Sequence, residues 1–135
     1  MGDVNDQYLL CTKDGKVLTA KKETLRAYDK QNRNKTGQRW MVKSEGTKMA
    51  FILNENGSYR VWKVDQEELE LKPIENMEEV SDPCYFERQN VGSGEHYGLR
   101  SVTKPVRYIC CPKGTNRLRL TSNIQQCVHI KDEKI

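Results

Sequence analysis

The sequence predicts an all-β protein, and within that class a β-trefoil of about twelve short strands with pseudo-threefold symmetry. Two observations carry this prediction. Short apolar runs recur about every ten residues along the whole chain. In addition, three hairpin-like stretches resemble one another at intervals of 51 and 49 residues. We expect residues 1–135 to form a single domain, because a chain of 135 residues suits one hydrophobic core.

The apolar runs are short and are divided by turn-forming residues. Turns are indicated by KDGK at 13–16, NENGS at 54–58 and PKGTN at 112–116. Residues 73–82 tolerate a helix, but the prolines around them limit it to a turn or two in a connection. The expected strands are YLLCT, KVLTA, LRAYD, RWMVK, MAFIL, YRVWKV, LELKPI, CYFERQ, YGLRSV, YICC, RLRLT and CVHIK.

The three similar stretches begin at Tyr8, Tyr59 and Tyr108. Each continues with an apolar strand and a polar turn, and each has a leucine ten residues after the tyrosine. Three units of four strands describe a trefoil, with six strands in a barrel and six in a capping layer. We therefore expect the three tyrosines to occupy equivalent positions. Chance spacing within an all-β sandwich is the alternative explanation.

Charged residues are distributed in blocks of opposite sign. Residues 13–48 carry 11 Lys and Arg against 4 Asp and Glu, and residues 65–95 carry 10 acidic residues against 2 basic ones. Residues 96–120 carry 6 basic residues and no acidic one. Such blocks predict faces of opposite sign, unless they are ordinary solvated surface. A surface of two signs favours a protein partner over a nucleic acid, which would require one broad basic face.

Patterns typical of enzymes are missing from the sequence. None of the six serines lies in a G-x-S-x-G motif, and GSGEHYG lacks the following helix and lysine of a phosphate-binding loop. We therefore predict that the protein is not an enzyme and uses no cofactor. No apolar run approaches the roughly 18 residues that a membrane helix needs, and the first residues lack the pattern of a secretory signal.

The chain has five cysteines, which are Cys11, Cys84, Cys110, Cys111 and Cys127. None forms a C-x-x-C pair and only two histidines could assist, so no metal site is expected. An odd number of cysteines argues against a fully paired disulfide framework, and we expect mostly free thiols.

Residues 98–111, GLRSVTKPVRYICC, are expected to form two strands joined by TKP, so that Pro105 lies outside the ladder. Leu99, Tyr108 and Ile109 should then be buried. Because adjacent residues of a strand point to opposite faces, Cys110 and Cys111 should differ in environment.

The same stretch resembles the signature of interleukin-1 family cytokines. Leu99 stands where the signature has an aromatic residue or cysteine, and Cys111 replaces its threonine. NDQYLLCTKDGKVLTA is similar to the family's first hairpin, and its NDQ resembles the interleukin-18 and interleukin-33 branches. ELELKPI and DPCYFERQNVGSG are similar to the segment before the family's long loop and to the strand after it. The matching signature positions are Ser101, Val102, Pro105, Tyr108, Ile109 and Cys110.

This resemblance implies a monomeric cytokine-like ligand that binds an interleukin-1-type receptor with immunoglobulin-like domains. An agonist would also recruit an accessory receptor, and an antagonist would not. The protein would act outside the cell, released without a visible signal peptide and cytoplasmic before release, with no insertion into a membrane. The candidate receptor contacts are exposed turn residues. They are Lys13, Asp14, Lys16, Arg33, Lys35, Arg39, Asn54 and Asn56.

Two other kinds of trefoil stay open. CYFER at 84–88 resembles a strand of the fibroblast growth factors, and RYICCPKGTNRLRL resembles their heparin-binding turn in outline. Heparin contacts would then be expected at Lys113, Arg117 and Arg119, although the early glycine-rich and Asp-Gly-Arg segment of those growth factors is missing. A viral or decoy protein, or another non-enzymatic trefoil such as a lectin, is the other alternative. The repeated Gln-x-Trp of ricin-type lectins is absent.

Overall fold

The structure, a computed structural model, describes residues 6–29, 36–92 and 94–135. Within these residues twelve strands belong to one continuous sheet. The strands are β1 (Gln7–Thr12), β2 (Lys16–Lys21), β3 (Thr24–Asp29), β4 (Trp40–Glu45), β5 (Lys48–Glu55), β6 (Ser58–Asp65), β7 (Glu68–Ile74), β8 (Phe86–Asn90), β9 (Tyr97–Ser101), β10 (Tyr108–Cys110), β11 (Arg119–Thr121) and β12 (Ile130–Lys134). Short 3-10 helices are η1 (Thr36–Gln38), η2 (Met77–Glu79), η3 (Asp82–Cys84) and η4 (Ile124–Gln126).

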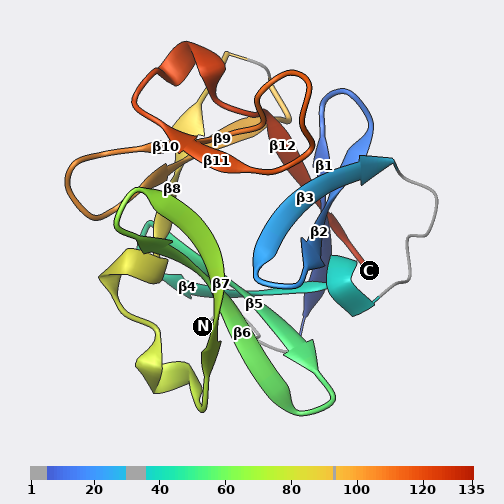
Figure 1. The fold of residues 1–135 in the computed structure, drawn as a ribbon, viewed down its shortest axis with the longest axis vertical. Helices are drawn as coiled ribbons and strands as arrows, with labels where there is room; N and C mark the ends of the chain where they lie inside the picture. Colours follow the sequence, from blue (N-terminus) through green and yellow to red (C-terminus); the bar gives the residue numbers. More distant parts are fainter. Residues whose placement is uncertain (1–5, 30–35, 93) are drawn as a thin grey trace.

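Six of the strands close into a barrel. The antiparallel pairs β1–β4, β4–β5, β5–β8, β8–β9, β9–β12 and β12–β1 form a complete ring. The remaining strands form the hairpins β2–β3, β6–β7 and β10–β11, which are arranged around the centre of the molecule in Figure 1. A six-stranded barrel capped by three hairpins is a β-trefoil, as the sequence predicts.

The predicted strands agree closely with the observed ones. Each of the twelve expected apolar runs overlaps one strand, and residues 73–82 contain the end of β7, η2 and the start of η3. The largest displacement is in the last strand, which was expected at 127–131 and begins only at Ile130. Cys127 and Val128 instead follow η4, and Cys127 meets Cys110 in an isolated β-bridge.

Aromatic side chains fill the space between the barrel and the hairpins. Trp62 on β6 meets Trp40 on β4 edge to face, with ring centroids 5.3 Å apart. Phe51 and Phe86 approach the same indole ring, at 4.4 and 6.2 Å. The indole N–H of Trp40 donates to the carbonyl of Leu18 at 3.0 Å. This cluster connects the barrel strands β4, β5 and β8 with two hairpins, since Trp62 lies on β6 and Leu18 lies on β2.

The expected equivalence of the three tyrosines is wrong for Tyr8. Tyr59 and Tyr108 lie on β6 and β10, which are the first strands of the second and third hairpins. Tyr8 lies on the barrel strand β1, whereas the corresponding hairpin strand of the first unit is β2. The pattern of an apolar strand, a polar turn and a second apolar strand also occurs where a barrel strand leads into a hairpin strand, as from β1 to β2. Tyr8 therefore lies one strand before the position that is equivalent to Tyr59 and Tyr108.

The stretch 98–111 forms β9, a turn and β10, with Pro105 in the turn as predicted. Leu99 and Ile109 are buried, with exposed fractions of 1% and 0%. Tyr108 is only half-buried, which corrects the prediction for this residue. It lies one position before Ile109 on β10 and therefore points to the opposite face of the strand.

Cys110 and Cys111 differ in environment, as the sequence predicts. Cys110 has an exposed fraction of 6%, whereas Cys111 is half-buried. The difference arises because Cys110 pairs with Arg119 within the third hairpin, while Cys111 lies beyond the end of β10.

Candidate functional site

The β1–β2 turn, the β10–β11 turn and the segment that leads from η4 into β12 lie at the top of the view in Figure 1. A groove lies between them. Its central part has a volume of about 410 Å³ and is lined by Asp14, Lys16, Lys113 and Thr115, among others. Adjoining hollows of about 320 and 480 Å³ share its walls. We call the three together the basic groove.

Lysines from two distant parts of the chain give the basic groove its positive charge. Lys13 and Lys16 come from the β1–β2 turn, and Lys113 comes from the β10–β11 turn. The lining also contains the carboxylate of Asp14, which accepts a hydrogen bond from the Thr12 hydroxyl. The same residues draw the turn together, because the Lys16 N–H donates to the Thr12 hydroxyl oxygen at 2.9 Å.

Backbone hydrogen bonds hold the two sides of the basic groove in place. The Lys13 N–H donates to the carbonyl of His129 at 3.0 Å, which joins the β1–β2 turn to the start of β12. Gly15, within the same turn, has φ of +87°, a conformation that glycine adopts without strain. The sequence KDGK therefore fixes the backbone that carries Lys13 and Lys16 on one side of the basic groove.

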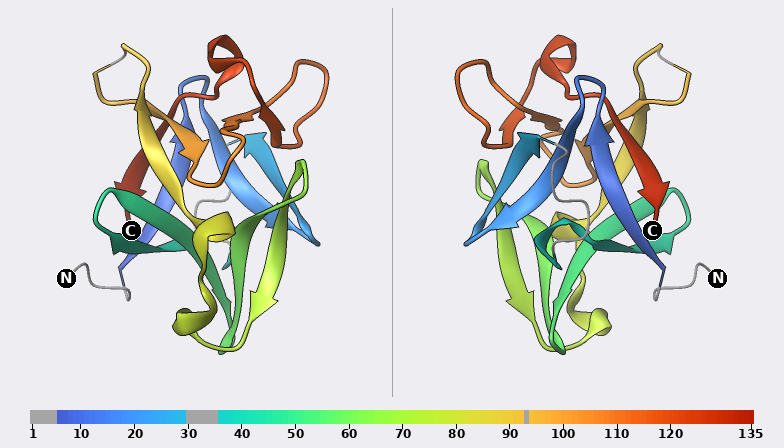
Figure 2. Two further views of the ribbon diagram at one scale, coloured as in Figure 1. Left: turned by 90° about the vertical axis from the view of Figure 1, so that its left-hand side faces the viewer. Right: turned by 90° about the vertical axis from the view of Figure 1, so that its right-hand side faces the viewer.

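The structure brings together three of the candidate contacts proposed from the sequence, namely Lys13, Asp14 and Lys16. Asn54 and Asn56 lie in or beside the β5–β6 turn, which points to the end of the molecule opposite the β1–β2 turn (Figure 2). In that turn the Asn54 side chain accepts the Gly57 N–H at 2.9 Å. One binding surface that uses all of these residues would have to extend over most of one side of the protein.

The remaining candidates come from the loop after β3. Arg33 and Lys35 lie outside the residues that the structure describes. Arg39 is half-buried beside Trp40, and its Nε atom is buried without a hydrogen-bond partner. It is therefore not the freely exposed turn residue that the sequence predicts.

The acidic and basic blocks of the sequence partly neutralise each other on the folded surface. Glu68 at the start of β7 lies 3.6 Å from Arg117 and 3.7 Å from Arg119. Its neighbour Glu67 lies 3.4 Å from Arg107. Arg107, Arg117 and Arg119 are thus paired with Glu67 and Glu68 at the β6–β7 turn, whereas Arg100 pairs with Glu87 on β8 and Lys113 lies in the basic groove.

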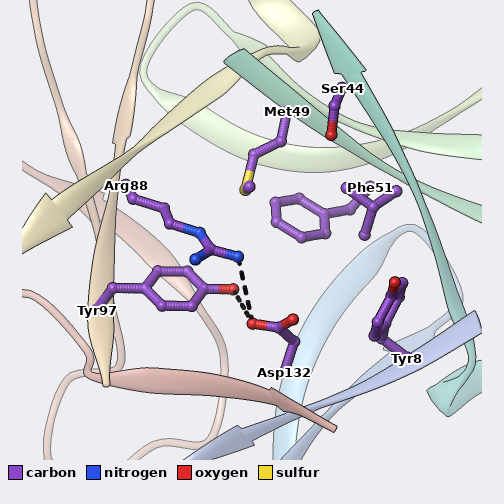
Figure 3. A pocket seen from close by; sticks show the side chains of 8 residues that line it. Tyr8, Ser44, Met49, Phe51, Arg88, Tyr97 and Asp132 are labelled. Atoms are coloured by element: carbon purple, nitrogen blue, oxygen red, sulfur yellow. Dashed lines mark hydrogen bonds and ion pairs between the residues drawn. The ribbon is translucent and has the colours of Figure 1, made fainter. Parts of the chain in front are cut away.

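A second pocket, of about 140 Å³, opens at the end of the barrel away from the three hairpins (Figure 3). Every barrel strand contributes to its lining. The lining residues are Tyr8, Val42, Ser44, Met49, Phe51, Arg88, Tyr97 and Asp132. The sequence does not reveal this pocket, because each of the six strands contributes only one or two of its residues and these share no motif.

The charged groups of this second pocket are paired with one another. The guanidinium of Arg88 lies over the Tyr97 ring, 4.3 Å from its centroid, and 3.5 Å from the Asp132 carboxylate (Figure 3). The Tyr97 hydroxyl donates to the same carboxylate at 3.0 Å. Burial raises the pKa of Tyr97 well above its usual value, so the hydroxyl stays protonated and continues to donate. The pocket is smaller and electrically more balanced than the basic groove.

Among the described residues, no group of three or more His, Cys, Asp or Glu could hold a metal ion. Burial raises the pKa of the thiols of Cys110, Cys111 and Cys127, so all three are protonated near neutral pH and are weak nucleophiles. No helix in the described ranges is long and apolar enough to cross a membrane.

Comparisons with known proteins support the fold. No protein-family model and no curated protein matches the chain. A designed 3-fold symmetric protein, ThreeFoil, superposes with a TM-score of 0.72 at 9% identity, over 96% of this chain and 99% of that one. The BEL β-trefoil superposes with a TM-score of 0.71 at 11% identity, over 100% of this chain and 97% of that one. The receptor binding domain of botulinum neurotoxin D does so with a TM-score of 0.70 at 13% identity, over 96% and 41%.

At these identities the likeness shows the fold alone. The chain is a β-trefoil protein, and it shares this fold with binding proteins such as the receptor binding domain of the neurotoxin.

Proposed function

We propose that this β-trefoil protein is a secreted cytokine-like ligand of an interleukin-1-type receptor with immunoglobulin-like domains. One observation carries the proposal: the stretch that resembles the family signature serves as core and turn of a trefoil. Leu99 and Ile109 are buried in the main core, and Ser101 is buried under the turn that contains Pro105. The resemblance in sequence therefore falls on residues that a trefoil requires.

The basic groove is the receptor contact that we propose. Its lysines line a concave surface, and its rim is polar, as in many protein interfaces. A receptor loop that carries acidic side chains would match the charges of Lys16 and Lys113. Such complementarity raises the association rate more than it slows dissociation.

A binding screen with a matched charge control tests this function. The protein is measured against interleukin-1-type receptor ectodomains by surface plasmon resonance. The variant Lys16→Glu/Lys113→Glu is compared with Lys21→Glu/Lys104→Glu, whose lysines are exposed away from the basic groove. Each variant replaces two positive charges by two negative ones, so both lower the net charge from +4 to 0.

We expect one receptor to bind the protein and the control. The groove variant should bind at least about tenfold more weakly, mainly through a slower association rate, and the association rate of the unchanged protein should fall as salt rises. Binding to none of the receptors would contradict the proposed function. Equal losses of receptor affinity in the two variants would show that binding depends on the net charge of the protein and not on the basic groove.

A heparin-binding growth factor is the second candidate, and the lysines of the basic groove favour it. Tight retention on a heparin column, with release only at high salt, would reveal many simultaneous contacts with a polyanion. The geometry predicts that Lys16→Glu/Lys113→Glu would abolish retention. Arg117→Glu/Arg119→Glu should weaken it less, because Glu68 already pairs with both arginines. Retention without binding to any interleukin-1-type receptor would establish this alternative.

A further inference from the structure

Two cysteines from different segments face each other across a β-bridge at one side of the basic groove. Cys110 is the last residue of β10, and Cys127 follows η4. They are antiparallel partners in an isolated bridge. The Val128 N–H donates to the carbonyl of Ile109 at 2.9 Å. This hydrogen bond joins the residue after Cys127 to the residue before Cys110. Cys110 and Cys127 are therefore a non-hydrogen-bonded antiparallel pair. In such a pair the two Cα atoms lie closer together than in a hydrogen-bonded pair.

This backbone geometry suits a disulfide. The Cα atoms of such a pair are typically about 4.5 Å apart and the two side chains lie on the same face, within the range that disulfides span. Adjacent Cys110 and Cys111 lack this arrangement, because neighbours on a strand point to opposite faces. The described cysteines thus include one pair that can join without displacing the strands.

The sulfur of Cys127 is packed against a glycine. A Cβ atom at Gly98 would lie 2.2 Å from the Cys127 sulfur, so the sulfur occupies the space that any side chain at 98 would need. Joining Cys127 to Cys110 would therefore require this sulfur to move away from Gly98.

Both thiols are close to solvent although they are largely buried. Each has an exposed fraction of 6%. Cys110 contributes to the hollow of about 480 Å³ beside Gln125, and Cys127 contributes to the central part of the basic groove. A small oxidant can therefore approach the pair from either hollow.

We propose that Cys110 and Cys127 form a redox-sensitive disulfide that fixes one wall of the basic groove. Burial raises the pKa of both thiols, so the exchange proceeds through the small fraction of thiolate present near neutral pH. With glutathione disulfide as oxidant, this thiolate of one cysteine attacks a sulfur of the oxidant and expels a glutathione thiolate. The second cysteine thiolate then attacks the mixed disulfide and expels the other. The two cysteines are oxidised, the glutathione disulfide is reduced to two thiols, and the two protons from the cysteines end on these thiols.

The disulfide would affect the same surface that we propose for receptor binding, and this part of the inference rests on that proposed function. The segment between Cys110 and Cys127 carries Lys113 and Thr115 in the wall of the basic groove. Joining its two ends would restrict the positions that this wall can take. Oxidation should therefore change the affinity of the basic groove for its partner.

Peptide mapping tests the bond itself. The protein is equilibrated with glutathione disulfide, the remaining thiols are alkylated, and a tryptic digest is analysed by mass spectrometry without reduction. We expect YICCPK to be linked to LTSNIQQCVHIK in the protein and in Cys111→Ser. The link should be absent from Cys110→Ser and Cys127→Ser. No link in a fully oxidising buffer would overturn the proposal, as would a link that survives Cys110→Ser and disappears in Cys111→Ser.

The consequence for binding is measured separately. The oxidised and reduced forms of Cys111→Ser are compared on the receptor found in the screen, with oxidised and reduced Cys127→Ser as the control. We expect the dissociation constant to differ at least about threefold between oxidised and reduced Cys111→Ser. It should be the same for oxidised and reduced Cys127→Ser. If the link forms but no receptor binds, the proposed function fails and the disulfide stands. If a receptor binds but no link forms, the disulfide alone is wrong.

Discussion

Ser101 and Arg107 close the turn between β9 and β10 with two hydrogen bonds of opposite direction. The Ser101 N–H donates to the carbonyl of Arg107 at 2.7 Å, and the Arg107 N–H donates to the Ser101 hydroxyl oxygen at 2.9 Å. The hydroxyl in turn donates to the carbonyl of Thr103 at 3.2 Å. The serine of the signature stretch is thus a structural residue of this turn.

Replacing Ser101 by alanine should lower the free energy of unfolding by about 1–3 kcal/mol. The change leaves the N–H of Arg107 without its partner at a site where Ser101 is only 2% exposed. Urea unfolding of the variant measures the loss. Ser58→Ala is the matched control, because Ser58 is exposed at the start of β6, and it should change stability by less than about 0.5 kcal/mol. An equally small effect of Ser101→Ala would show that the turn does not depend on the hydroxyl.

Ile109→Ala should be more costly. Ile109 is fully buried in the main core, and truncation of such a side chain to alanine typically costs about 2–5 kcal/mol. Thermal or chemical unfolding measures the difference. Ile124 in η4 is 39% exposed, so Ile124→Ala should stay within about 0.5 kcal/mol. A loss well under 1 kcal/mol for Ile109→Ala would place the signature stretch on the surface.

Gly98→Ala should destabilise the protein through its contact with Cys127. The added methyl group would meet the Cys127 sulfur at 2.2 Å and a Val91 methyl group at 3.3 Å. Replacing Cys127 by alanine removes the sulfur, so Gly98→Ala should cost less in a Cys127→Ala background. A double-mutant cycle should give a coupling energy of at least about 1 kcal/mol. Additive effects would show that the sulfur is not the obstacle.

The stability of the protein should fall in alkaline solution partly through Tyr85. Burial, with the nearby Glu45 carboxylate that accepts its hydroxyl at 3.1 Å, raises the pKa of Tyr85 to about 12 from its ordinary 10.0. The folded state therefore favours the protonated phenol. This stabilisation is complete below pH 10 and is lost between pH 10 and about 12.

Urea unfolding at several pH values across this range should show a shallower decline for Tyr85→Phe than for the unchanged protein. Phenylalanine keeps the ring in the core but has no proton to lose. Parallel curves would mean that Tyr85 contributes nothing to the alkaline loss.

Most of the fold follows from local patterns in the sequence. The apolar runs and the turns KDGK and NENGS locate nearly every strand, because hydrophobic alternation and turn chemistry act over a few residues. The equivalence of strands is harder to predict. Tyr8 was assigned to the wrong layer, because a strand of the barrel and a strand of a hairpin look alike when only a few apolar residues are compared.

The candidate site depends on contacts that the sequence does not reveal. Lys13 and Lys16 are recognisable as turn residues, but their proximity to Lys113 arises only when the ends of the chain meet in the barrel. Likewise, the pairing of Glu68 with Arg117 and Arg119 joins segments almost fifty residues apart. Charge blocks that look separate along the chain are neighbours on the surface.

The pairing of β1 with β12 also bears on how the protein is made. Tyr8 lies opposite Lys134, so β1 finds this partner only after β12 has been synthesised. Until then one edge of β1 and one edge of β9 lack their final neighbours, and unpaired edges favour aggregation. Closure of the barrel therefore follows the synthesis of β12, and the two open edges are exposed to wrong pairing before that point.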